Sequence, residues 1–181
     1  GFTKNIDEAL KIEAELVGKM IASSVSKNLI KIFYLTEDIR KDPGVEGFSG
    51  EAQEFQRIGV LGAGLMGGGI AQLMAHNNLP ARMKDINLAA VAKGTEAAAK
   101  VFSDSVKKRR MTPKEMMNKM ALITGATDYS GFNKVDLIIE AIVENLDVKK
   151  KVFAEIDAIA PPHAILASNT SSLSITEMAK V

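Results

Sequence analysis

Two α-helices are predicted at the start of the chain, between about Ile6 and Ile39. Serines at positions 23, 24 and 26 interrupt the pattern and mark the break between the helices. Within each helix the apolar residues recur with helical spacing and so share one face: Ile12, Leu16 and Met20, then Leu29, Ile32 and Phe33.

From Arg57 onward, short apolar runs alternate with longer amphipathic segments. The runs typical of strands are Ile58–Leu61, a run that reaches Met83 and Lys84 and ends at Asp85, Leu137–Val143, and Ala164–Ala167. The helical segments are Ile70–Asn77, a long helix from about Leu88 to Val106, a helix that starts at Thr112, Val148–Ile159, and a last one that opens at Ser174. The long helix is expected to bury one apolar side, made of Leu88, Val91, Ala98, Val101, Phe102 and Val106. This alternation predicts an α/β fold, a Rossmann-type doubly wound parallel sheet with right-handed crossovers.

Local signals support several of these elements. Leu137–Val143 is apolar almost throughout, as a strand buried on both faces should be. Thr112 and Ser174 are each followed three residues later by a glutamate, Glu115 and Glu177, which is the capping-box pattern of a helix start.

A stretch without hydrophobic period separates the first helices from the α/β region. It is rich in glycine and acidic residues, which is typical of a linker. We therefore divide the chain into a short α-helical connector (1–41), a linker (42–56) and a Rossmann domain (57–181).

Composition narrows the class of protein. The 181 residues suffice for one domain of ordinary size and a further segment. A net charge of +1 gives no electrostatic reason to expect nucleic acid or an anionic membrane as partner. The chain has no cysteine, which excludes disulfides and thiolate metal sites. No apolar run approaches the roughly 18–20 residues of a membrane span. The first residues, Gly1-Phe2-Thr3, lead us to expect a piece of a longer protein.

The strongest chemical signal is the turn Gly62-Ala63-Gly64-Leu65-Met66-Gly67 between the first strand and the next helix. In a dinucleotide-binding turn, the first glycine permits the tight turn and the second lets a pyrophosphate approach the backbone. The third lets helix and strand pack closely. The helix N-terminus then offers N–H groups to the phosphates. Gly68 and Gly69 are expected to extend the flexible stretch. The alternative is a glycine-rich turn that serves packing alone.

Asp85 strengthens the dinucleotide interpretation. It follows the turn at the end of the second strand, near the spacing of about 20 residues that the fingerprint requires. A carboxylate there can accept hydrogen bonds from the adenosine ribose and repels a 2′-phosphate, which favours NAD over NADP. The alternative is that Asp85 only caps the helix that starts near Leu88.

Four blocks of sequence, in order and correctly spaced, resemble the 3-hydroxyacyl-CoA dehydrogenase family: Gly59–Gly67, Met83–Asn87, Glu140–Asn145 and Ala167–Ser172. The first helices resemble the connector that follows an enoyl-CoA hydratase domain in multifunctional β-oxidation α-subunits. The resemblance implies NAD-dependent oxidation of an (S)-3-hydroxyacyl-CoA to the 3-ketoacyl-CoA in fatty-acid β-oxidation. It also implies a thiolase β-subunit as partner, and a location in the bacterial cytoplasm or, in a eukaryote, the mitochondrion.

The resemblance also assigns residues to a site. Gly62, Gly64, Leu65, Met66 and Gly67 would contact the dinucleotide, and Asp85 the adenosine ribose. Ile142, Val143 and Glu144 would line the nicotinamide side, with Lys149 near the nicotinamide ribose. Asn169 and Ser171 would face the reacting carbon, where Ser171 would bond the substrate hydroxyl.

Structural alternatives stay open for several of these residues. Glu144 and Asn145 can be helix-capping residues, and Ser171 a turn residue. Lys149 with the two lysines after it can be a solvated helix face. The basic run Lys107–Arg110 can anchor the phosphates of coenzyme A, although a solvated helix end is the preferred interpretation.

The family's general base is a histidine in a Gly-x-His-Phe-Phe-Asn-Pro stretch, with a partner glutamate, and we expect both beyond Val181. His76 and His163 fit surface positions better. No metal site is predicted. Two other functions remain open. One is NAD-dependent oxidation of another β-hydroxy acid, such as 3-hydroxyisobutyrate or 6-phosphogluconate, against which the Ser-Asn-Thr-Ser block argues. The other is a non-catalytic NAD-binding or structural role, against which the connector helices argue.

Overall fold

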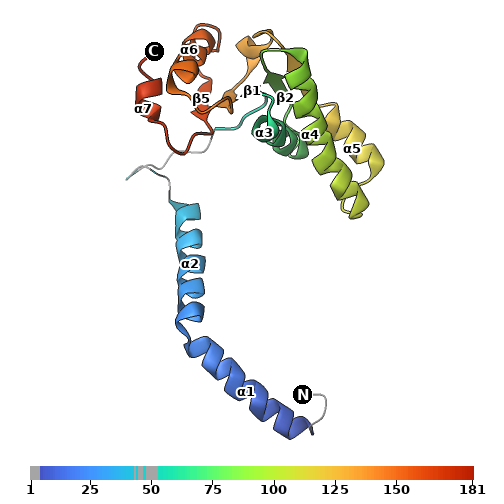
Figure 1. The fold of residues 1–181 in the computed structure, drawn as a ribbon, viewed down its shortest axis with the longest axis vertical. Helices are drawn as coiled ribbons and strands as arrows, with labels where there is room; N and C mark the ends of the chain where they lie inside the picture. Colours follow the sequence, from blue (N-terminus) through green and yellow to red (C-terminus); the bar gives the residue numbers. More distant parts are fainter. Residues whose placement is uncertain (1–4, 43, 45–46, 48–52) are drawn as a thin grey trace. The chain divides into compact units, whose positions relative to one another are not determined.

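The computed structural model describes residues 5–42, 44, 47 and 53–181. The chain divides into two compact units, Gly1–Ala52 and Gln53–Val181 (Figure 1). Most of the predicted linker lies outside the described residues. Its last part belongs to the second unit, since the backbone N–H of Gln56 donates to Asp136 at 2.8 Å.

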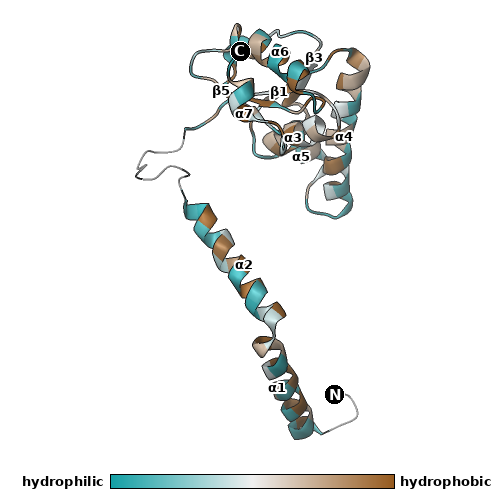
Figure 2. Cartoon of the chain, turned by 60° about the vertical axis from the view of Figure 1, so that its left-hand side comes forward, coloured by the Kyte–Doolittle hydropathy of each residue, from teal (hydrophilic) through white to brown (hydrophobic). Residues whose placement is uncertain are grey.

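The first unit contains the two predicted helices, α1 (Ile6–Ala22) and α2 (Ser24–Lys41). Ser23 lies between them and caps α2, because its hydroxyl accepts the N–H of Ser26 at 3.1 Å. The break therefore falls at the serines, as predicted. Neither helix buries a residue within the described part of this unit, and their large apolar side chains are exposed. In Figure 2, brown segments mark apolar residues along both helices.

The second unit is built on a five-stranded parallel sheet of order β3-β2-β1-β4-β5. The strands are β1 (Ile58–Leu61), β2 (Ala81–Lys84), β3 (Ile123–Ala126), β4 (Leu137–Glu140) and β5 (Ile165–Ser168). The chain builds outward from β1 to β3 and then crosses to β4 on the other side of β1. This reversal of strand order is the switch point where Rossmann-type sheets bind their ligands.

Helices cover both faces of this sheet, which confirms the doubly wound α/β prediction. On one face α3 (Leu65–His76) and α4 (Leu88–Lys107) share a core with β1 and β2 that includes Val60, Met83 and Val91. On the other face α6 (Leu146–Asp157) packs with the short helix η1 (Phe132–Lys134) around Leu61, Phe132 and Ile156. Two short helices complete the unit, α5 (Pro113–Met120) and α7 (Ile175–Met178).

The start of α3 differs from the prediction, which placed it at Ile70. The helix begins at Leu65, so Gly68 and Gly69 are helical rather than part of a flexible stretch. A Cβ on Gly68 would lie 2.5 Å from the carbonyl oxygen of Gly94 in α4. Gly68 therefore serves the close packing of α3 against α4.

Two further predictions need correction. The strand β3 was not predicted, and it forms the edge of the sheet by pairing with β2. The buried face of α4 consists of Val91, Gly94, Ala98 and Phe102, whereas the predicted face residues Leu88 and Val101 are exposed.

Of the two predicted capping boxes, one forms fully and the other only in part. At Thr112 both arms form, with Glu115 accepting the backbone N–H of Thr112 at 2.7 Å. At Ser174 only the hydroxyl arm forms, because Glu177 pairs with Lys150 and Lys180 instead. Among the described residues, every helix is too short or too polar to span a bilayer.

Candidate functional site

A groove of about 590 Å³ lies at the carboxyl ends of β1, β2 and β4, at the reversal of strand order. It is lined by the glycine turn after β1, by the end of β2, and by the loop after β4. Most of the residues predicted to bind a cofactor line it: Gly62, Gly64, Leu65, Met66, Asp85, Ile142 and Val143.

The three fingerprint glycines each meet a different physical demand. Gly62 has a φ of +95°, and a Cβ there would lie 2.5 Å from the carbonyl oxygen of Ala141. A Cβ on Gly67 would lie 1.8 Å from the carbonyl oxygen of Gly62, so this glycine lets the helix approach the turn. A Cβ on Gly64 would meet no described atom within 4 Å. The turn is therefore open at Gly64, where the fingerprint places a pyrophosphate.

Gly64 also forms the N-cap of α3, without a side-chain cap from the described residues. The first amide groups of a helix have no partner within the helix. Here they lie at the groove, where the helix N-terminus favours an anion.

Asp85 lies at the end of β2 and faces the glycine turn. Its carboxylate accepts the N–H of Ala63 at 2.6 Å and that of Ile86 at 2.7 Å. Asn87, not Asp85, caps α4, because its side chain accepts the N–H of Ala90 at 2.9 Å. The helix-cap alternative for Asp85 is therefore wrong.

Lys84 also lines the groove, and the sequence analysis did not propose it. Its ammonium lies 4.3 Å from the centre of the Tyr129 ring, a cation–π contact. The Tyr129 hydroxyl in turn donates to Glu155 at 2.8 Å. Burial, then the bond to Glu155, raises the pKa of Tyr129 well above its usual range.

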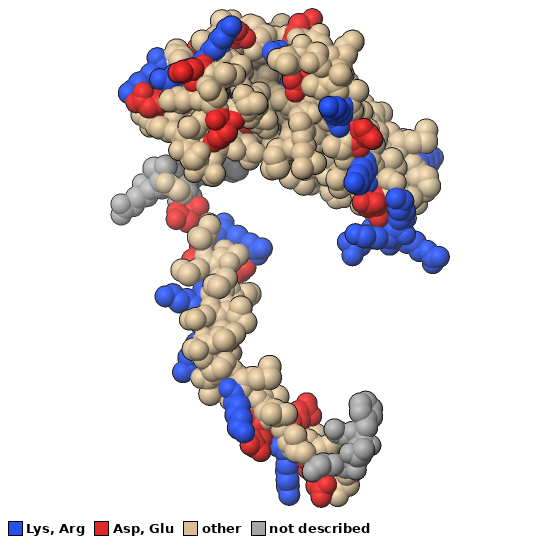
Figure 3. All heavy atoms as spheres, viewed as in Figure 1, with Lys and Arg blue, Asp and Glu red and all other residues tan. Residues whose placement is uncertain are grey.

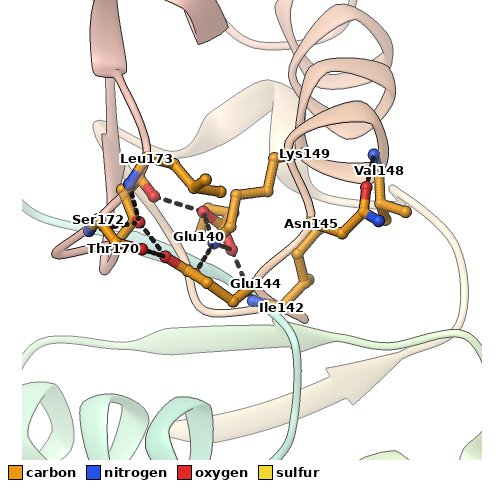
Figure 4. A network of polar contacts seen from close by, with 10 residues as sticks. Glu140, Ile142, Glu144, Asn145, Val148, Lys149, Thr170, Ser172 and Leu173 are labelled. Atoms are coloured by element: carbon orange, nitrogen blue, oxygen red, sulfur yellow. Dashed lines mark hydrogen bonds and ion pairs between the residues drawn. The ribbon is translucent and has the colours of Figure 1, made fainter.

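Beside the groove, a buried ion pair joins β4 to α6 (Figure 4). The Lys149 ammonium lies 2.7 Å and 2.8 Å from the two carboxylate oxygens of Glu140. Both side chains are buried, with exposures of 1% and 0%. Glu140 also accepts the N–H of Ile142 at 2.7 Å and the hydroxyl of Ser168. The structure thus corrects the picture of Lys149 as part of a solvated face, and Lys149 is not among the residues that line the groove.

Glu144 extends this network to the loop after β5. Its carboxylate lies 3.1 Å from Lys149 and accepts the hydroxyls of Thr170 and Ser172. The Thr170 hydroxyl, followed by Lys149, holds the pKa of Glu144 below its usual range. Asn145 caps α6 by accepting the N–H of Val148 at 3.1 Å. The capping alternative therefore holds for Asn145 but not for Glu144.

The loop after β5 divides by alternation into two sets. The hydroxyls of Ser168, Thr170 and Ser172 all donate to Glu140 or Glu144. The residues between them, Asn169 and Ser171, are exposed. These two residues are the ones that the resemblance assigns to the substrate end. Glu140 and Ser168 were not predicted as site residues, although a glutamate inside an otherwise apolar strand is a signal that a buried partner exists.

Other candidates lie away from the groove. His76 and His163 are exposed. His163 lies 3.4 Å from Asp136, just before β4 and β5 begin, whereas the groove lies where the strands end. Basic side chains gather at the end of α4 (Figure 3), where residues 107–110 are exposed. Lys107 there pairs with Asp104 at 3.5 Å.

Known proteins resemble this chain over far more than the groove. The family profile described as "3-hydroxyacyl-CoA dehydrogenase, NAD binding domain" matches residues 57–181. Two fatty acid oxidation complex α-subunits, from Vibrio vulnificus and Shewanella baltica, are 35% and 36% identical over 181 residues. The alignments cover 99% of this chain and 25% of each relative, so the chain spans about a quarter of their length.

Solved structures agree with the sequence comparisons. An (S)-3-hydroxybutyryl-CoA dehydrogenase from Ralstonia eutropha is 41% identical, with a TM-score of 0.67 over 70% of this chain and 44% of that protein. A 3-hydroxybutyryl-CoA dehydrogenase from Escherichia coli is 31% identical, with a TM-score of 0.68 over 71% of this chain and 27% of that one. With the groove at the switch point, these matches show that the chain belongs to the 3-hydroxyacyl-CoA dehydrogenase family and carries its NAD-binding domain.

Proposed function

We propose that this chain is the NAD-binding part of an enzyme that oxidises an (S)-3-hydroxyacyl-CoA to the 3-ketoacyl-CoA in fatty-acid oxidation. One observation carries the proposal: a single groove is lined by the glycine turn and Asp85 and also by Ile142 and Val143 from the loop after β4. Such a groove can hold both halves of a dinucleotide across the switch point.

The residues present fit NAD. The open space at Gly64 suits a pyrophosphate, and the first amides of α3 can donate to it. Asp85 lines the groove and can accept a ribose hydroxyl while it repels a 2′-phosphate. Ile142 and Val143 offer an apolar wall to the nicotinamide ring, and Glu144 and Lys149, 3.1 Å apart, follow that wall in the chain.

Bound NAD would supply the acceptor for the hydride. The residues of this chain would orient the reactants, with Asn169 and Ser171 exposed at the carboxyl end of β5. Ser171 would hydrogen-bond the substrate hydroxyl, and Asn169 would help to fix the reacting carbon. The family's Gly-x-His-Phe-Phe-Asn-Pro stretch does not occur in these 181 residues. We therefore assign proton abstraction to none of them.

The relatives also suggest an assembly. Because two similar proteins are named as α-subunits of a fatty acid oxidation complex, we propose that α1 and α2 form a connector from a hydratase domain. We further propose that the protein works with a thiolase β-subunit, in the cytoplasm of a bacterium.

A substrate comparison tests this function. The protein, at the length of its relatives, is given NAD and one of three substrates: 3-hydroxybutyryl-CoA, 3-hydroxyisobutyrate or 6-phosphogluconate. We expect NADH absorbance to rise with the thioester alone. Oxidation of either free acid in place of the thioester would refute the proposal, and NAD binding without any turnover would favour a non-catalytic role.

A further inference from the structure

Glu140 is the most deeply buried charge in the described part of the chain, and no role in the proposed reaction uses it. It is 0% exposed and does not line the groove. Its carboxylate nevertheless receives four hydrogen bonds, two from Lys149 and one each from Ile142 and Ser168. A buried charge is retained only when it is paired and hydrogen-bonded, so the position of each donor is constrained.

These donors come from three separate elements. Lys149 lies in the first turn of α6, Ile142 in the loop after β4, and Ser168 at the end of β5. Glu140 itself ends β4, and its carbonyl oxygen accepts the N–H of Asn169 at 2.8 Å. One residue therefore holds two segments, the loop 141–145, whose first residues line the groove, and the loop 169–173 beside it (Figure 4).

Lys149 also links Glu140 to a second carboxylate, that of Glu144. Its ammonium lies between Glu140 and Glu144, and Glu144 accepts the hydroxyls of Thr170 and Ser172. Without the Glu140 carboxylate, Lys149 would have Glu144 as its one remaining carboxylate partner among the described residues, and the Glu144 side chain is 45% exposed. We expect the Lys149 ammonium then to shift toward solvent with Glu144, and the loops 141–145 and 169–173 to shift with it.

We propose that Glu140 is a positioning residue for the nicotinamide end of the site, acting through Lys149, Ile142 and Ser168 rather than by contact with NAD. This inference rests on the proposed function, because it concerns how that function's cofactor is held. It predicts a defect confined to one half of the dinucleotide. The adenosine half is held by Asp85 and the glycine turn, which Glu140 does not touch.

The test compares the affinities of NAD and ADP by titration calorimetry. ADP keeps the adenosine and both phosphates but lacks the nicotinamide half. We expect Glu140→Gln to weaken NAD binding by about tenfold, within the range for substitutions that act on a site without touching its ligand. ADP binding should change by less than about twofold, within the few tenths of a kcal/mol typical of a remote, uncoupled site.

Asp136→Asn is the matched control. It is the same isosteric neutralisation, just before the other end of β4, where Asp136 accepts the N–H groups of Gln56 and Arg57. It should lower stability while leaving the ratio of NAD to ADP affinity unchanged. If Glu140→Gln weakens both ligands equally, or neither, Glu140 has only a structural role and the proposal fails.

If Glu140→Gln does not fold, a second variant tests the same proposal. Ser168→Ala removes one hydroxyl donor from Glu140 and leaves the ion pair. It should lower the NAD-to-ADP affinity ratio in the same direction, and an unchanged ratio would overturn the proposal. Failure of the proposed function is distinguishable, because the unaltered protein would then bind NAD normally yet leave 3-hydroxybutyryl-CoA unoxidised.

Discussion

Two glycines of similar surroundings offer a sharp test of the dinucleotide site. A Cβ on Gly64 and a Cβ on Gly69 would each meet no described atom within 4 Å beyond the immediate backbone. Only Gly64 lines the groove. We therefore expect Gly64→Val and Gly69→Val to fold equally well and to differ in NAD binding.

The expected stability changes are small at both positions. At Gly64 the φ is −72° and the ψ −166°, an extended conformation that valine adopts readily. Valine is a poorer N-cap than glycine by up to about 1 kcal/mol, and this is offset by about 0.4–1 kcal/mol from the reduced freedom of the unfolded chain. Inside α3, valine at position 69 improves helix propensity over glycine by a few tenths of a kcal/mol.

The expected binding change at Gly64 is large. A valine side chain would occupy the space of the pyrophosphate and remove at least two charge-assisted hydrogen bonds, each worth about 1.5–3 kcal/mol. The loss of at least about 3 kcal/mol corresponds to about a hundredfold weaker NAD binding. Gly69→Val should bind NAD as the unaltered chain does.

Thermal unfolding and titration calorimetry on the same samples measure both quantities. A melting temperature within about 4 °C of the unaltered chain is expected for each variant, as a change of about 1 kcal/mol implies. If Gly64→Val binds NAD normally, the pyrophosphate does not lie at this turn. Equal loss of binding in both variants would mean that bulk anywhere in α3 disturbs the site.

Three further predictions follow from the same contacts. Asp85→Ala should cost about 1.5–3 kcal/mol of NAD binding and narrow the preference for NADH over NADPH, measured by calorimetry with each cofactor. Gly68→Ala should lower the unfolding free energy by about 1–3 kcal/mol in urea, because its Cβ would press on the Gly94 carbonyl. The N–H groups of Gln56 and Arg57 hold the pKa of Asp136 below its usual range. Asp136 therefore contributes stability above about pH 4 that is lost at lower pH, and the stability gap between the unaltered chain and Asp136→Asn should shrink in acid unfolding curves.

Much of the fold was predictable because its signals are local. Short apolar runs indicated β1, β4 and β5, and Thr112 with Glu115 marked a helix start that the structure contains in full. The start of α3 was missed because Gly67–Gly69 suit a loop by local preference, whereas Gly94, distant in sequence, explains Gly68. The edge strand β3 was missed for a similar reason: its residues become a strand by pairing with β2.

The site likewise has a part that local sequence signals predict and a part that they do not. The glycine turn and Asp85 form one local motif and its partner at a standard spacing, so the adenosine end could be inferred from sequence. The nicotinamide end depends on which lysine of Lys149, Lys150 and Lys151 turns inward. The phase of α6 decides this, since Lys149 lies on the buried face with Phe153 and Ile156.

That phase also explains the Ser-Asn-Thr-Ser block. Once Lys149 is buried against Glu140 and Glu144, the two carboxylates accept further donors from the end of β5 and from the bend that follows it, which the Thr170 hydroxyl holds by accepting the N–H of Leu173 at 3.1 Å. Ser168, Thr170 and Ser172 are these donors, which leaves Asn169 and Ser171 exposed. The block therefore joins two requirements in one segment: hydroxyls at even positions donate to Glu140 and Glu144, and polar groups at odd positions remain available for a ligand. An Asn169→Ala variant should accordingly keep the stability of the chain within about 0.5 kcal/mol, the usual range for an exposed position, whereas Thr170→Val should lower it. If urea unfolding ranks the two in the opposite order, the division of this loop by alternation is wrong.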